Sequence, residues 1–197
     1  TDWILPPLSS LVVGLLFGSP ALIPFITMRS FSEERRLGTL ETLISTPISN
    51  SMVVVGKWCA CYLFFLLIVL LAFGYPFILS ILFPVQGQNL GFNEKEIWLG
   101  NALFISMFGA SFTSIGIFAS SLTKNQMVAG MLTFTILTLY ISCMAYLFGR
   151  NFSYDKNDLL DILYLSINST MNGLNKLEQF AVGLIDIPTV LHQFTIT

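Results

Sequence analysis

Charged side chains are scarce in this sequence: Lys, Arg, Asp and Glu make up 10% of its 197 residues, against about 25% in ordinary soluble domains. Hydrophobic residues account for 54%, and the mean hydropathy is +0.77. A water-soluble fold of this size needs more polar side chains to cover its surface. The composition therefore predicts an integral membrane protein. The formal net charge of -2 also gives no basic surface of the kind that binds nucleic acid.

Residues that bind metals are equally few. The one histidine, His192, has no evident partner, and the three cysteines lie inside apolar runs, where a thiol usually behaves as a small hydrophobic group. On a helix, the side chains of Cys59 and Cys61 point about 200° apart. Cys143 is far away in the sequence, and no second Cys or His pair completes a coordination set. The sequence predicts neither a disulfide framework nor a metal site.

The sequence also lacks the motifs of enzymes that could work in a membrane. Gly56-Lys57-Trp58 has neither the upstream glycine nor the hydroxyl residue of a phosphate-binding loop, so the chain is not expected to hydrolyse ATP alone. No H-E-x-x-H or G-x-S-x-G motif occurs. We predict no catalytic residue and no cofactor bound by this chain.

Long apolar stretches are abundant by contrast. A helix needs about 20 apolar residues to cross a bilayer, and four stretches reach that length, at about 3–28, 52–83, 97–122 and 127–149. Residues 150–187 are too polar to cross and are expected to form an outer segment, while 188–197 could begin a last span. The predicted fold class is an all-α, polytopic transmembrane helical bundle, with four complete spans of six in a longer parent chain.

The positions of the basic residues predict the orientation in the membrane. The segment 29–51 and the short link between the third and fourth spans are expected to face the cytoplasm, which places residue 1 outside. Lys57, at the start of the second span, is expected to extend its ammonium group to the lipid headgroups. The inner side then carries Arg29, Arg35, Arg36, Lys57 and Lys124.

Small residues mark positions at which membrane helices approach each other closely. Gly14 and Gly18 form a G-x-x-x-G pair. A second set recurs at offsets of three and four along the third span: Ser106, Gly109, Thr113, Gly116 and Ser120. A tight interhelical seam, involving a partner subunit for example, is the favoured interpretation of this set, and a polar wall of a translocation path is the alternative.

Two further expectations concern side chains within the spans. Phe108, which points about 100° away from Gly109 on a helix, is expected to tolerate substitution better than the glycine. The hydroxyls of Thr133 and Thr135 in the fourth span are expected to bond to their own helix.

The segment from Arg29 to Lys57 contains several patterns that are typical of short helices. Ser30 and Glu33 have the spacing of a capping box, and Glu33 and Arg36 have that of an ion pair on a helix. Gly38 would then interrupt this first short helix, because glycine costs about 1 kcal/mol relative to alanine in a helix interior.

A second short helix is expected after this break. Thr39 can cap it, Glu41 falls in its first turn, where negative charge is favourable, and Pro47 ends it. Leu40 begins its apolar face, which continues with Leu43 and Ile44. By physical chemistry alone, the two pieces could be ordinary amphipathic helices lying at the membrane surface.

One sequence motif gives this segment a more specific interpretation. The stretch MRSFSEERRLGTLETLISTPIS, followed by Gly56-Lys57, resembles the first cytoplasmic loop of type-2 ATP-binding-cassette exporter permeases. The bacterial gliding-motility-associated permease subgroup is the most similar. Residues 180–186, FAVGLID, resemble the beginning of the last span in that subgroup.

The resemblance implies a function and a set of partners. It implies a permease subunit of an ATP-driven exporter in the bacterial plasma (inner) membrane, paired with a second permease half and with two cytoplasmic ATPase subunits that bind ATP and Mg²⁺. The implied ATPase-coupling residues are Glu33, Glu34, Arg35, Arg36, Gly38, Thr39, Leu40, Glu41 and Pro47. A pore or channel subunit, or a membrane scaffold without an ATPase, remains the alternative, and the spans suit lipids, glycans, hydrophobic drugs or peptides equally well as cargo.

Overall fold

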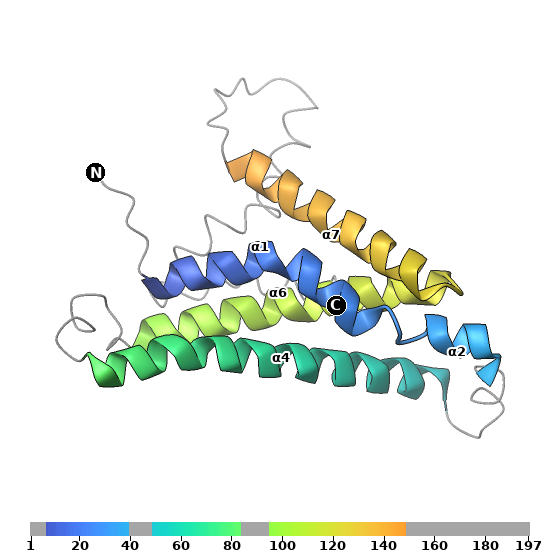
Figure 1. Cartoon of the computed structure of the whole chain (residues 1–197), viewed down its shortest axis with the longest axis horizontal. Helices are drawn as coiled ribbons and strands as arrows, with labels where there is room; N and C mark the ends of the chain where they lie inside the picture. Colours follow the sequence, from blue (N-terminus) through green and yellow to red (C-terminus); the bar gives the residue numbers. More distant parts are fainter. Residues whose placement is uncertain (1–6, 40–48, 84–94, 149–197) are drawn as a thin grey trace, which may run out of the picture.

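A computed structural model describes residues 7–39, 49–83 and 95–148, and every regular element within these ranges is a helix (Figure 1). The helices are α1 (Pro7–Thr27), α2 (Ser32–Leu37), α4 (Asn50–Leu82), α6 (Lys95–Leu122) and α7 (Gln126–Phe148). Four of them, α1, α4, α6 and α7, are long and apolar enough to cross a membrane. The predicted all-helical transmembrane fold class is therefore confirmed. The predicted outer segment and the start of a last span lie outside the described residues.

Helix α6 lies at the centre of the bundle. It packs against α1, α4 and α7, whereas α4 and α7 flank the α1/α6 pair on different sides (Figure 1). All four long helices contribute to one hydrophobic core. Its buried members are Val12, Leu16, Ile23, Phe65, Val69, Phe104, Ile105, Phe108, Phe112, Leu137, Ile141 and Met144.

Aromatic rings run along the inner face of α6. Phe104 and Phe108 lie 4.6 Å apart between ring centroids, Phe108 and Phe112 lie 5.9 Å apart, and Tyr140 of α7 meets Phe112 edge to face. The spacing of four residues places these rings on one face of the helix. Phe108 is 1% exposed. A smaller side chain there would leave a cavity in the core. That Phe108 tolerates substitution better than Gly109 stays a prediction.

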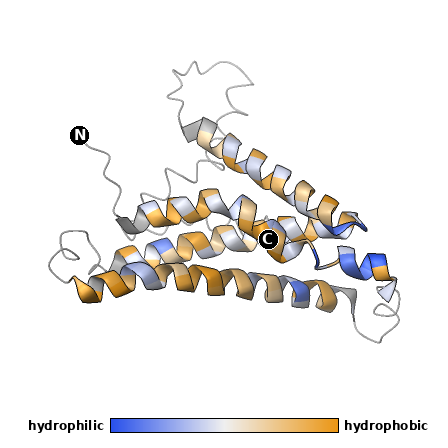
Figure 2. Ribbon diagram, in the orientation of Figure 1, coloured by the Kyte–Doolittle hydropathy of each residue, from blue (hydrophilic) through white to orange (hydrophobic). Residues whose placement is uncertain are grey.

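The outward faces of the bundle are apolar. Figure 2 shows hydrophobic residues along most of α4, and the large exposed side chains in its middle are Leu63, Phe64, Leu67, Leu70 and Leu71. In a water-soluble protein, such a continuous apolar surface would be a liability. In a helix that crosses a bilayer, it is the surface that contacts lipid.

Proline is tolerated inside α1 because a neighbouring side chain compensates for it. Pro20 has no N–H with which to bond to the carbonyl oxygen of Leu16 one turn earlier. The hydroxyl of Ser19 donates to that oxygen instead, at 2.6 Å. The carbonyl is therefore satisfied within the apolar core, where an unpaired one would be costly.

Most hydroxyls in the spans bond to their own helix. Thr133 donates to the carbonyl of Ala129 and Thr135 to that of Met131, at 2.9 and 2.8 Å, which confirms the prediction for these two residues. Thr113 of α6 likewise donates to carbonyls of its own helix. These hydroxyls are thus satisfied without a partner helix.

Candidate functional site

The helix α2 is the polar element of the structure. Its sequence, SEERRL, is hydrophilic apart from its last residue (Figure 2). It follows the end of α1 and contacts α6 and α7 near the point where one passes into the other (Figure 1). Residues 28–31, which lead into α2, and residues 123–125, which join α6 to α7, therefore lie at the same end of the bundle. The assignment of this end to the cytoplasm stays a prediction.

The first turn of α2 is capped from a distant helix. The N-cap residue is Phe31, which has no side-chain acceptor, and the helix begins at Ser32. The hydroxyl oxygen of Ser120, in the last turn of α6, accepts hydrogen bonds from the backbone N–H groups of Phe31 and Ser32 at 3.1 and 3.2 Å. The predicted capping box of Ser30 and Glu33 is therefore wrong, because the helix starts later and its cap comes from α6.

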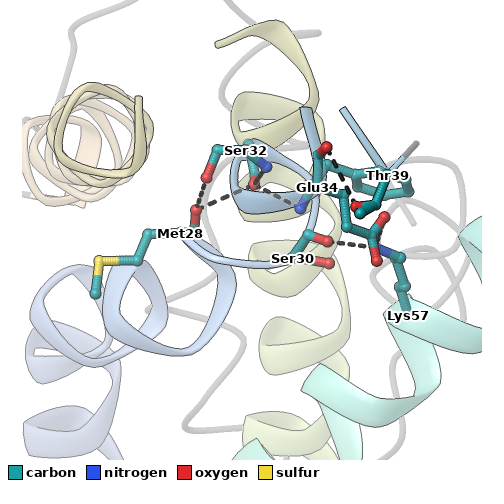
Figure 3. A network of polar contacts seen from close by, with 8 residues as sticks. Met28, Ser30, Ser32, Glu34, Thr39 and Lys57 are labelled. Carbon is teal, nitrogen blue, oxygen red and sulfur yellow. Dashed lines mark hydrogen bonds and ion pairs between the residues drawn. The ribbon is translucent and has the colours of Figure 1, made fainter. Parts of the chain in front are cut away.

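Ser120 uses its full hydrogen-bonding capacity at this junction. A hydroxyl has one donor and two acceptor positions, and that of Ser120 also donates to the carbonyl of Met28 at 3.3 Å. Ser32 donates its own hydroxyl to the same carbonyl (Figure 3). Ser120 and Ser32 are both fully buried. An N-cap interaction typically contributes about 0.5 to 2 kcal/mol.

A second span also holds α2. The ammonium group of Lys57 in α4 lies 2.5 Å from a carboxylate oxygen of Glu34, and it donates to the backbone carbonyl of Ser30 (Figure 3). The same group sits 4.3 Å from the centre of the Phe31 ring. Lys57 therefore points at the junction of α1 and α2. The expectation that it extends freely to lipid headgroups is corrected, because anionic and aromatic partners are within its reach.

The end of α2 is formed by Gly38, as predicted. Its backbone has φ = 72°, a left-handed conformation that glycine adopts without strain, and its N–H bonds to the carbonyl of Glu34. The hydroxyl of Thr39 donates to the same carbonyl at 3.4 Å. The proposed second helix, with Leu40, Glu41 and Pro47, lies outside the described residues.

The remaining face of α2 is open. Arg35, Arg36 and Leu37 are exposed, and the exposed fraction of Leu37 is 62%. Among the residues placed by the structure, Glu33 and Arg36 do not form the predicted ion pair, and the carboxylate of Glu34 has the basic partner instead. The helix thus has an attached side, held by α4 and α6, and a free side with two cations and one apolar side chain.

The small residues of α6 lie against other helices of the same chain. A Cβ atom at Gly109 would overlap the ring of Phe65 in α4, and one at Gly116 would lie 2.9 Å from the Cβ of Thr27 in α1. Thr113 is fully buried and Ser106 is half-buried. The close neighbours thus belong to α1 and α4 rather than to a partner subunit. A role in translocation stays a prediction.

The other glycine pair is in a different environment. A Cβ atom at Gly14 or Gly18 would meet nothing within 4 Å, and Gly14 is exposed on α1. Within the described part of the chain, this pair makes no close helix contact. Its predicted role in helix packing stays a prediction.

Sequence reasoning identified α2 but missed the residues that hold it. Ser120 was assigned to a packing face, and nothing in the sequence links it to a helix that precedes it by 88 residues. Lys57 could have been singled out from the sequence, because it is the one charged residue of α4 and a charge in an apolar helix needs a partner. Where the structure places side chains, no group of three or more His, Cys, Asp or Glu residues could hold a metal ion.

The sequence model of the family described as "ABC-2 family transporter protein" matches residues 8–178. No curated protein and no solved structure matches significantly. Because the family match extends from the first turn of α1 to beyond α7, the chain belongs to the ABC-2 transporter family, as a multi-pass membrane permease subunit, and this membership implies partnership with an ABC ATPase.

Proposed function

We propose that this protein is the membrane-spanning permease subunit of an ATP-driven exporter. In this proposal, the segment 29–51 docks onto a separate ATPase subunit, and closure of the ATPase moves the spans. ATP and Mg²⁺ bind to the ATPase. The observation that carries the proposal is the attachment of α2 to two spans at once, through Lys57 of α4 and Ser120 of α6. A force on α2 would reach both helices.

The free side of α2 supports a docking role. Arg35, Arg36 and Leu37 are exposed next to one another, at the end of the bundle where α6 passes into α7. An exposed leucine that follows two arginines suits a protein interface, because arginine is enriched there and the centre of the interface is apolar. Glu41 is a further proposed docking residue, on the basis of the sequence motif alone.

The proposed assembly contains two permease halves and two ATPase subunits in the bacterial inner membrane. The second half is either another copy of this chain or a related permease. The most similar subgroup is that of gliding-motility-associated permeases, on the basis of the motif around Gly38 and Thr39. The cargo is left open, because neutral spans with scattered hydroxyls suit several classes of substrate.

Co-purification tests the proposal. The neighbouring genes are searched for a phosphate-loop ATPase, and the full-length protein, carrying an affinity tag, is expressed with that ATPase and extracted in mild detergent. We expect the ATPase to co-purify and the complex to hydrolyse ATP. An ATPase whose phosphate-loop lysine is replaced by alanine should still bind but should not hydrolyse. A permease that purifies without an ATPase would contradict the proposal, and ion conductance without ATP would favour the pore alternative.

A further inference from the structure

The two contacts that hold α2 differ in kind. Ser120 is fully buried and forms three hydrogen bonds with backbone groups of the junction. The side chains of Lys57 and Glu34, in contrast, are 19% and 32% exposed. The Glu34 oxygen that faces Lys57 is buried while the pair is closed, but water can reach these partly exposed side chains once the pair opens. Buried backbone N–H groups, in contrast, have no substitute acceptor.

The two contacts also lie at different points along α2. Ser120 binds the N–H groups of Phe31 and Ser32, at the first turn. Lys57 also contacts this junction, through the carbonyl of Ser30 and the ring of Phe31, but its ion pair is with Glu34, in the middle of the helix (Figure 3). If only the ion pair opened, α2 would stay attached at its first turn and could change its angle to α4. If only the Ser120 bonds opened, buried N–H groups would be left unpaired.

We propose that Ser120 is a fixed joint for α2 and that the Lys57–Glu34 ion pair is a releasable latch that sets the angle between α2 and α4. Lys57 and Glu34 are then positioning residues for the segment that docks onto the ATPase. The inference rests on the proposed function for its role in transport, but the latch itself is a property of this chain. It can be tested without the ATPase.

The test measures the distance between α2 and α4. The three native cysteines, Cys59, Cys61 and Cys143, are replaced by alanine, and spin labels are attached to cysteines introduced at two exposed positions, Arg36 of α2 and Leu71 of α4. Double electron–electron resonance is recorded on the full-length protein in lipid nanodiscs. The closed latch should give one dominant distance.

Neutral variants should open the latch. Lys57→Met keeps an unbranched side chain over the Phe31 ring but removes the charge, and Glu34→Gln removes the opposite charge. Each should raise the ratio of open to closed populations about fivefold, the size expected for a partly exposed ion pair. The double variant should open no further than Lys57→Met, since the ion pair is already lost in that single variant.

Two controls make the result specific. Lys57→Arg retains the charge and should keep the dominant distance. Lys124→Met neutralises an exposed lysine at the same end of the bundle and should change nothing. An unchanged distance in Lys57→Met, an equal change in Lys124→Met, or additive effects in the double variant would each overturn the latch. These outcomes leave the exporter proposal intact, whereas a missing ATPase partner would overturn only that proposal.

Discussion

The hydroxyl of Ser120 accepts a hydrogen bond from the backbone N–H of Ser32, although 88 residues separate the two in the chain. In most helices, a residue next to the first turn accepts hydrogen bonds from the first backbone N–H groups. In α2, Ser120 at the end of α6 takes this role. As a consequence, the first turn of α2 cannot move away from the bundle without breaking its hydrogen bonds to α6.

Replacing Ser120 by alanine should loosen α2. The variant leaves buried N–H groups of Phe31 and Ser32 without an acceptor, which should destabilise the attachment of the helix by about 1 to 3 kcal/mol. The rate at which trypsin cleaves after Arg35 and Arg36 in the detergent-solubilised protein reports how often α2 detaches. We expect cleavage there to become at least about fivefold faster, as a loss of 1 kcal/mol or more implies.

The matched control is Ser121→Ala. The hydroxyl of Ser121 donates to the carbonyl of Phe118 in its own helix, so its loss should leave the trypsin rate unchanged. Ser120→Thr, which keeps a hydroxyl, should cleave more slowly than Ser120→Ala. Equal rates for the two alanine variants would show that α2 is held by other contacts.

Close packing around Gly116 gives a second prediction. A leucine at this position would have to displace Thr27, which is fully buried and bonds to the carbonyl of Ile23. Overpacking of this kind costs about 1 to 3 kcal/mol. The melting temperature of the purified protein should therefore fall in Gly116→Leu. Gly74→Leu is the control, since a Cβ atom at Gly74 meets nothing within 4 Å.

A leucine at Gly14 distinguishes packing within the chain from packing against a second permease half. Gly14→Leu should leave the melting temperature of the isolated chain unchanged, because its position is open. If Gly14 packs against a second permease half, the variant should nevertheless reduce the yield of the assembled complex. Equal melting temperatures for Gly116→Leu and Gly74→Leu would contradict the packing seen at Gly116.

The predicted orientation leads to a third test. In a protein without native cysteines, a cysteine introduced at Asn89 or Asn157 should react with an impermeant thiol reagent added to intact cells. A cysteine at Ser49 should not react until the membrane is opened. Labelling at Ser49 with protection at Asn89 would invert the orientation and place α2 outside the cell.

Sequence patterns predicted the spans well because their signal is local. Runs of apolar residues are as long as a bilayer is thick, and Gly38 marked the end of α2 because few other residues adopt its backbone conformation. The capping box at Ser30 failed for the opposite reason. Its spacing is also local, but the actual cap, Ser120, comes from a contact that depends on how α6 packs.

The partner of Lys57 was only partly predictable. A lone charge in an apolar helix needs a partner, and Glu33 and Glu34 both lie in the segment that precedes this helix. The choice of Glu34 depends on the turn at residues 28–31, which the sequence pattern does not specify. Likewise, Gly109 and Gly116 were recognised as close-packing positions, but their neighbours, Phe65 and Thr27, depend on the packing of helices far apart in the chain.

Photo-crosslinking tests most directly whether α2 docks onto the ATPase. A benzophenone amino acid is placed at Leu37 on the free side of α2, and separately at Leu67 on the lipid-facing side of α4, which are 62% and 53% exposed. After irradiation of membranes that contain both subunits, Leu37 should give an adduct with the ATPase and Leu67 should not. A co-purifying ATPase that crosslinks to Leu67, or that does not crosslink to Leu37, would contradict the account.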